Sequence, residues 1–151
     1  MISDDFDEIE RYAHMWNWLP DWDIVKSIYE TFPESYSVLT PFAYSYLEEI
    51  IRSTTREYGI APVDEKGNKI KKRKTCEELI KLAIHENRDK AEYVKLLKSI
   101  KEKHYKPASE FDQGNNRHST THGFMHPRFW TKESFEELIH DIAELSKYGM
   151  F

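Results

Sequence analysis

Residues 131–145 read TKESFEELIHDIAEL, and this stretch has the clearest helical period in the chain. Its apolar side chains recur at spacings of three and four, which places them on one face of an α-helix. They are Phe135, Leu138, Ile139, Ile142 and Leu145. Thr131 stands at the N-cap position, where a hydroxyl oxygen can accept a hydrogen bond from the first turn. The stretch therefore predicts a helix that begins after Thr131 and buries this face.

The same period runs through residues 75–104. Thr75 and Glu78 form a capping-box pattern, which predicts a helix start. The apolar face of that helix consists of Leu79, Ile80 and Ala83. Asn87 interrupts the pattern, and a second helix is expected over Ala91–His104. Its apolar residues are Tyr93, Leu96, Leu97 and Ile100.

The longest uninterrupted helix is expected to follow Thr40-Pro41. We interpret Thr40 as its N-cap and Pro41 as its first helical residue, where the missing N–H of proline does no harm. Gly59 is placed to be its C-terminal cap. The side chains predicted to share one face are Phe42, Tyr46, Ile50 and Thr54.

Two shorter helices are expected in residues 1–32. The first is predicted to begin at Ser3 as N-cap and to end by Pro20. Its apolar stripe consists of Phe6, Ile9, Ala13 and Trp16. The second is predicted from about Asp21 to Phe32, with Ile24, Ile28 and Phe32 on one side.

Strict alternation of apolar and polar residues, the sign of a strand, is nearly absent from the chain. We therefore expect an all-α fold, a compact bundle of about six or seven helices in a single domain over residues 1–151. Residues 1–32 are expected to form an N-terminal helical extension. Residues 60–74 are expected to form a basic loop or a small two-stranded excursion, because Pro62 and the Lys66-Gly67-Asn68 turn supply no buried face.

The composition excludes several classes of protein. Hydrophobic residues make up 39% of the 151 positions and charged residues 32%, too apolar for a disordered chain and too charged for a membrane protein. No apolar run approaches the roughly 20 residues that cross a bilayer, and the opening residues are acidic where a secretory signal is basic. We expect a cytoplasmic protein. One cysteine excludes a multi-cysteine zinc site, and the five glycines form no phosphate-loop pattern.

Opposite charges gather in two places. Residues 1–23 hold seven acidic residues and one basic residue, whereas residues 66–74 hold six basic residues and no acidic one. A solvated loop is the ordinary explanation of such a basic run. The run nevertheless gives a polyanion a local binding site, although the formal net charge of the chain is -5.

Four of the seven histidines lie between His104 and His126, and three of them fall in residues 116–126, NRHSTTHGFMH. Histidine accepts and gives a proton near neutral pH, so this cluster is the place to look for acid–base chemistry or metal binding. A short helix is expected here, capped by Asn115 or Asn116 and ended by Gly123. Arg117 would then lie in the first turn, where free N–H groups attract an anion and its guanidinium suits phosphate.

Arg117 and His122 are five positions apart, which rotates them by about 140° on an ideal helix. One copy of the helix presents such a pair poorly to a single atom. Two copies around a two-fold axis would direct both pairs into a shared cleft, so the spacing favours a dimer.

Asn116-Arg117-His118, three further residues and His122-Gly123 resemble the Arg-x4-6-His motif of the HEPN superfamily. Its members are small all-α proteins of toxin–antitoxin pairs, abortive-infection systems and CRISPR effectors. Residues 47–52, LEEIIR, are similar to acidic and basic positions that many members place in a long helix. The resemblance covers the core from about residue 33 onward and departs from the plain members at Met125–Trp130, which is longer.

The resemblance implies RNA cleavage by a homodimer, without a metal or other cofactor. Arg117 would hold the phosphate and His122 would be the general acid or base. Asn116 and His118 would be supporting, RNA-binding residues. Glu48 or Arg52 would bond to the motif across helices, the alternative being an ordinary salt bridge. The implied role is phage defence or toxin–antitoxin function, with an antitoxin or defence-system partner and no membrane association.

Two other functions stay open. The first is a non-catalytic HEPN-like dimeric module that binds or scaffolds a partner. The second is a metal-binding protein, because His118, His122 and His126 are spaced to lie on one face of an unbroken helix. Gly123 and Pro127 weaken that helix, and no glutamate follows His118 as in a zinc peptidase.

The tryptophans of the N-terminal segment are also ambiguous. Trp16, Trp18 and Trp22 are suited to stacking on bases. They lie in an acidic segment that repels phosphate, which favours a place in the core or in a protein interface.

Overall fold

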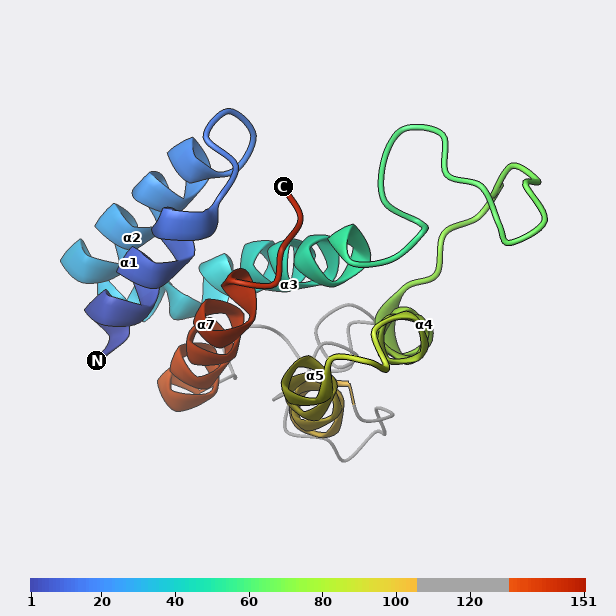
Figure 1. Ribbon diagram of the computed structural model, residues 1–151. Helices are drawn as coiled ribbons and strands as arrows, with labels where there is room; N and C mark the ends of the chain where they lie inside the picture. The colour runs from blue at the N-terminus through green and yellow to red at the C-terminus, as the bar shows by residue number, and fades with distance from the viewer. Residues whose placement is uncertain (106–130) are drawn as a thin grey trace.

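The computed structural model describes residues 1–105 and 131–151, and these residues form an all-α bundle (Figure 1). The elements in chain order are α1 (Ile2–Tyr12), α2 (Leu19–Thr31), the 3-10 helix η1 (Pro33–Ser35), α3 (Tyr36–Ser53), α4 (Cys76–Glu86), α5 (Ala91–His104) and α7 (Lys132–Ser146). Within the described ranges the only pairing of extended backbone is an antiparallel bridge between Val63 and Lys69. The all-α prediction is confirmed.

Helix α3 is the axis of the bundle. Helices α1 and α2 lie side by side at its N-terminal end, and α7 packs against α1 and α3 (Figure 1). Helix α4 packs against α3 and α5, and α5 also contacts α7. The loop 54–75 projects from the C-terminal end of α3, at the opposite end of the molecule from α1 and α2. None of the helices described is both long enough and apolar enough for a bilayer crossing.

The last three described helices follow the sequence pattern. All five apolar residues predicted for the face of α7 are fully buried, as are Leu79, Ile80 and Ala83 of α4. Thr131 caps α7 as predicted, its Oγ1 accepting the N–H of Ser134 at 3.0 Å. Thr75 is the N-cap residue of α4, but its side chain makes no capping hydrogen bond.

Helix α3 begins and ends earlier than predicted. Thr40 is not its N-cap: the Thr40 hydroxyl donates to the Tyr36 carbonyl at 2.7 Å, and Pro41 lies inside the helix. The helix starts at Tyr36 because the turn before Pro41 buries Leu39 and Thr40 in the core, which offsets the hydrogen bond that proline lacks.

Hydroxyl groups, and not Gly59, end α3. Ser53, Thr54 and Thr55 each donate to the carbonyl three residues earlier, at 2.6, 2.8 and 2.8 Å. These bonds satisfy the carbonyls that a continuing helix would use, so the helix stops at Ser53. Gly59, with φ +103°, lies in the following loop.

The two N-terminal helices also differ from prediction. Met1 and not Ser3 is the N-cap of α1, and α1 ends at Tyr12, which leaves Trp16 outside the helix and 79% exposed. On α2 the predicted face is wrong: the exposed fractions of Ile24, Ile28 and Phe32 are 57%, 40% and 60%. The buried face consists of Trp22, Val25 and Tyr29.

The reason lies in two competing stripes on α2. Both repeat at helical spacing, but the stripe with Trp22 and Tyr29 offers far more aromatic area to bury. Trp22 packs edge-on against Phe42 and Tyr46, with ring centroids 5.1 and 5.0 Å away. The larger stripe therefore faces the core.

Candidate functional site

The predicted catalytic pair lies outside the described residues. Arg117 and His122 fall between the two described ranges, and so do Asn116, His118 and the segment Met125–Trp130. The three histidines considered for metal binding fall there too. The structure therefore describes the two ends of this 25-residue stretch, Tyr105 and Thr131, and the helices that precede and follow it.

Those two helices, α5 and α7, are antiparallel neighbours held by a polar cluster. His104 Nε2 lies 2.7 Å from Asp141 Oδ2, and both residues are only 3% exposed. Lys103 Nζ lies 3.2 Å from Asp141 Oδ1 and 3.5 Å from Glu137 Oε1. The cluster joins the C-terminal end of α5 to the middle of α7, immediately before the chain leaves the described range. We call these four residues the α5–α7 clasp.

Burial and charge oppose each other at Asp141. Burial alone would raise the pKa of its carboxyl, but the hydrogen bond from His104 and the charges of His104 and Lys103 bring the pKa below its ordinary value. The carboxylate is therefore ionised at neutral pH. The edge of the Tyr44 ring covers the His104 imidazole, with centroids 6.1 Å apart. Because the His104 side chain is shielded from solvent, we assign it a structural role.

Glu48 and Arg52, the two predicted supporting residues that the structure describes, lie on α3 and bind the segment that enters α4. Glu48 Oε1 accepts the N–H of Cys76 at 2.6 Å, and Arg52 Nη2 donates to the Lys74 carbonyl at 2.9 Å. Arg52 Nη1 also lies 3.4 Å from Glu49. Cys76 has φ +55°, a strained value for a non-glycine residue. Glu48 thus stabilises a strained helix start, and a bond from either residue to the motif stays a prediction.

Arg52 has one further property. Its Nε is buried and makes no hydrogen bond with any residue of the ranges 1–105 and 131–151. A buried guanidinium donor without an acceptor is unfavourable. No acceptor for this donor is found in the described part of the chain.

The loop 54–75 is held by buried and half-buried charges that sequence reasoning did not find. Glu57, 1% exposed, accepts the Lys74 N–H at 2.7 Å and lies 3.4 Å from Lys74 Nζ. Arg73 Nε donates to the Glu57 carbonyl at 3.0 Å, and Arg73 Nη2 donates to the Gly59 carbonyl. The two ends of the loop are therefore tied together.

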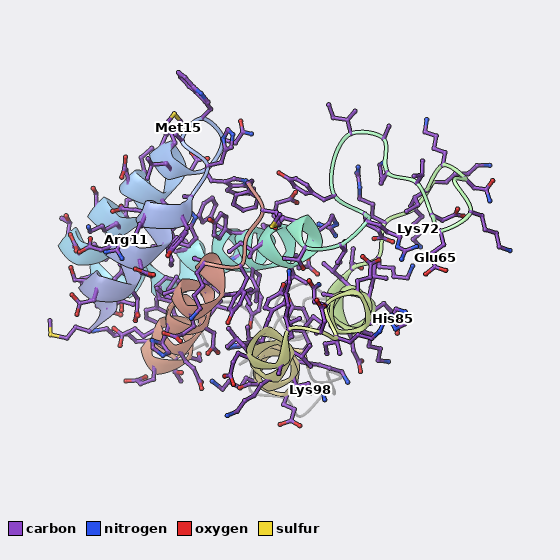
Figure 2. All side chains as sticks on the ribbon, in the orientation of Figure 1. Arg11, Met15, Glu65, Lys72, His85 and Lys98 are labelled. Carbon is purple, nitrogen blue, oxygen red and sulfur yellow. The ribbon has the colours of Figure 1, made fainter. Side chains whose placement is uncertain are left out.

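Arg56 is the second anchor of the loop. Its Nε lies 2.5 Å from Glu86 Oε1 at the end of α4, and its Nη2 lies 3.0 Å from Glu65 Oε1 in the loop. The bond to Glu86 ties the start of the loop to the C-terminal end of α4. Between the loop and α4 is an open pocket of about 480 Å³, whose lining includes Lys66, Lys72 and Leu82 (Figure 2 labels Lys72 and Glu65).

Residues 62–70 form a tight hairpin at the tip of the loop. Asp64 Oδ1 accepts the N–H groups of Lys66 and Asn68, each at 2.9 Å, and Gly67 closes the turn with φ +82°. The N–H of Asn68 makes the largest contribution to lowering the pKa of Asp64. Ile70 N–H donates to the Pro62 carbonyl at 2.9 Å. An acidic side chain here fixes the shape of a basic segment.

The described part of the chain contains no group of three or more His, Cys, Asp or Glu side chains that could hold a metal ion. The bonds of the clasp and of the loop anchors join residues 9 to 38 positions apart, so no local pattern marks them. The one sequence signal for the clasp was the histidine cluster between His104 and His126, which included His104 but did not indicate its partner Asp141.

We compared the chain with protein-family models, with curated proteins and with solved structures, and none of these comparisons gives a match.

Proposed function

We propose that the protein is a metal-independent endoribonuclease of the HEPN kind, which acts as a homodimer with Arg117 and His122 as its catalytic pair. The observation on which this depends is the sequence Asn116-Arg117-His118, three residues, His122-Gly123, within an otherwise helical chain. The all-α fold of the described residues agrees with the family that this motif implies.

The length of the stretch that contains the motif supports the proposal. The clasp holds the end of α5 against Asp141, and Thr131 lies ten residues before Asp141, about 15 Å along the axis of α7. A direct connection over such a distance needs only a few residues. The chain places 25 residues there, enough for the short helix and the motif that the sequence predicts.

The chemistry follows from the two side-chain types. A general base takes the proton of a ribose 2'-hydroxyl, whose oxygen then attacks the neighbouring phosphorus. The bond from phosphorus to the 5'-oxygen breaks, and a general acid protonates that oxygen. His122 of one subunit acts as base and its copy as acid, while Arg117 stabilises the charge on the phosphoryl oxygens. Asn116 and His118 contact the phosphate or orient the pair.

The remaining residues and partners have supporting roles. Arg52 enters the proposal because its buried Nε has no acceptor in the described ranges. For Glu48 the bond to Cys76 already supplies a structural role, and support of the motif is a second one. We propose a cytoplasmic enzyme of phage defence or of a toxin–antitoxin pair, with an antitoxin or another defence protein as partner.

The direct test uses purified protein, end-labelled RNA and variants of the pair. Arg117→Ala and His122→Ala are expected to lower the cleavage rate at least 100-fold. The matched controls are Arg128→Ala and His126→Ala, the same residue types in the same stretch, which are expected to keep the wild-type rate. Equal cleavage by wild type and both catalytic variants would mean that the nuclease is a contaminant.

The products and the response to a chelator give an independent test. We expect ends with a 2',3'-cyclic phosphate and a 5'-hydroxyl, and unchanged activity in excess EDTA. A 5'-phosphate product, or activity lost to the chelator, would indicate a metal-activated water instead. A dimer that binds RNA without cleaving it would favour the non-catalytic binding module.

A further inference from the structure

The basic run 66–74 separates into two groups in the structure. Arg73 and Lys74 are used internally, since both bond to Glu57 at the base of the loop. The other four, Lys66, Lys69, Lys71 and Lys72, are exposed, and their ammonium groups form no ion pair with any described residue. The four exposed lysines lie within seven consecutive positions, 66–72, in the hairpin and the two residues that follow it.

The acidic side chains of the loop and of the first turn of α4 have hydrogen-bond or ion-pair partners other than these four lysines. The carboxylate of Asp64 is bound to backbone N–H groups, Glu65 pairs with Arg56, and Glu57 is buried against Lys74. In the first turn of α4, Glu77 pairs with Lys81 and Lys101, and Glu78 pairs with Lys81. The acids therefore fix the loop, and the field that reaches solvent from its tip is positive.

The shape of the hairpin is set before any ligand arrives. The Asp64 bonds, the bridge between Val63 and Lys69, and buried Pro62 hold the backbone that bears the lysines. A ligand that binds here would have to order only the four lysine side chains, because the backbone of the loop is already fixed. Less conformational entropy is then lost on binding than with a flexible loop. A solvated loop that serves only solubility needs no such anchoring.

We propose that the four exposed lysines bind the sugar–phosphate backbone of single-stranded RNA without reading its sequence. Lysine binds phosphate as a point charge, and it supplies no flat bidentate face for a base. The inference rests on the proposed function for the identity of the polyanion, because the substrate of that reaction is RNA. The loop holds the strand by its backbone while cleavage takes place at Arg117 and His122.

The test measures binding of a fluorescein-labelled 20-nucleotide RNA by anisotropy in full-length His122→Ala, which is expected not to cleave it. With four phosphate contacts, we expect affinity to fall about 50-fold between 50 and 200 mM salt. In Lys69→Ala/Lys71→Ala the fall should be only about sevenfold, and affinity at 50 mM salt should be about tenfold weaker or more. The matched control is Lys95→Ala/Lys98→Ala on α5, which is expected to bind as the parent does.

The outcomes separate the two proposals when the same lysine variants are also made with His122 intact. Binding and salt dependence equal to those of the control would overturn the inference, even if the wild type cleaves RNA. Weakened binding together with a wild type that never cleaves would support the inference and reject the ribonuclease. If the lysine variant binds RNA normally but loses dimer mass in sedimentation at low salt, the loop contacts the acidic residues of a second copy, and the inference is wrong.

Discussion

The two ends of α3 are stabilised in opposite ways. At the N-terminal end, α1 and α2 bury a cluster of aromatic rings, in which Phe6, Trp22 and Tyr29 are at most 3% exposed. At the C-terminal end, the loop 54–75 has few buried apolar side chains and is held by Glu57, Arg73 and Arg56. Both ends have a defined shape, but only the first buries a large apolar area.

The difference separates global stability from local shape. Apolar burial contributes roughly 25 cal/mol for each Å² and is lost only when the helices separate. A charged hydrogen bond contributes about 1.5 to 3 kcal/mol, and its loss frees mainly the segment that it ties. Substitutions at the first end should therefore lower the free energy of unfolding, and substitutions at the second should open the loop.

The largest effect is expected from Trp22→Ala. The variant removes a side chain that packs on Phe6, Phe42 and Tyr46, and it should lower the free energy of unfolding by about 4 kcal/mol. Urea denaturation followed by circular dichroism measures the change. Trp16→Ala, at 79% exposure, is the matched control and should shift stability by less than about 0.5 kcal/mol. Similar losses in both variants would contradict the packing of α2.

The second effect concerns the clasp, a polar cluster inside the apolar bundle. Asp141→Asn should lower the free energy of unfolding by about 2 to 3 kcal/mol at pH 7, because His104 and Lys103 lose a buried charged partner. Since folding lowers the pKa of Asp141, the carboxylate stabilises the fold above its ordinary value of 3.8 and loses this contribution as the pH falls through the folded pKa.

The pH dependence checks the cause. The difference between wild type and Asp141→Asn, measured by urea denaturation from pH 7 to pH 3, should be constant down to about pH 4 and narrow below it. A difference that stays constant down to pH 3 would show that the carboxylate charge does not contribute.

A pair of substitutions tests which side of α2 faces the core. Val25→Ala should lower the free energy of unfolding by about 2 kcal/mol, because the side chain is buried. Ile24→Ala should change it by less than about 0.5 kcal/mol, since Ile24 is 57% exposed. The opposite ranking in chemical denaturation would favour the stripe predicted from the sequence.

The smallest change in the free energy of unfolding is expected from a substitution in the loop 54–75, which follows α3. Glu57→Gln weakens the tie to Lys74 and should lower the free energy of unfolding by about 1 kcal/mol. Trypsin cleavage after Lys66–Lys72 should become several-fold faster, because the loop opens without global unfolding. Glu102→Gln on α5, an exposed residue outside the loop, is the control and should leave the cleavage rate nearly unchanged. Equal rates in all three proteins would mean that Glu57 does not hold the loop.

Sequence reasoning succeeded where one local pattern decides a helix. Thr131 and the apolar spacing of α7 fix its start and its buried face. The predicted face of α4 is buried as well, and so is that of α5 except for Leu96, which is half-buried. It failed where two alternatives competed. Helix α2 has two apolar stripes, and only one of them is buried. Helix α3 ends at Ser53, whose hydroxyl bonds to a backbone carbonyl, although the sequence pattern there is also compatible with a longer helix. In α2 the deciding quantity was the apolar area buried by each stripe, and in α3 it was the number of hydroxyl-to-carbonyl hydrogen bonds. The spacing of residues in the sequence gives neither quantity.

The candidate site divides in the same way. Glu48 and Arg52 were singled out from a local run, and their partners at residues 74–76 lie more than 20 positions away. The clasp and the loop anchors also depend on tertiary contacts between distant residues. Charge counting located the basic run, but only the ion pairs show which of its six residues face solvent unpaired.

The clasp joins the last residues of α5 to the middle of α7, two helices that stand on either side of residues 106–130 in the chain. The contact between these helices is therefore made by their own side chains and does not rely only on the backbone that connects them. Asp141, which accepts from both His104 and Lys103, sets the distance between the two helices at the point where the described chain is interrupted.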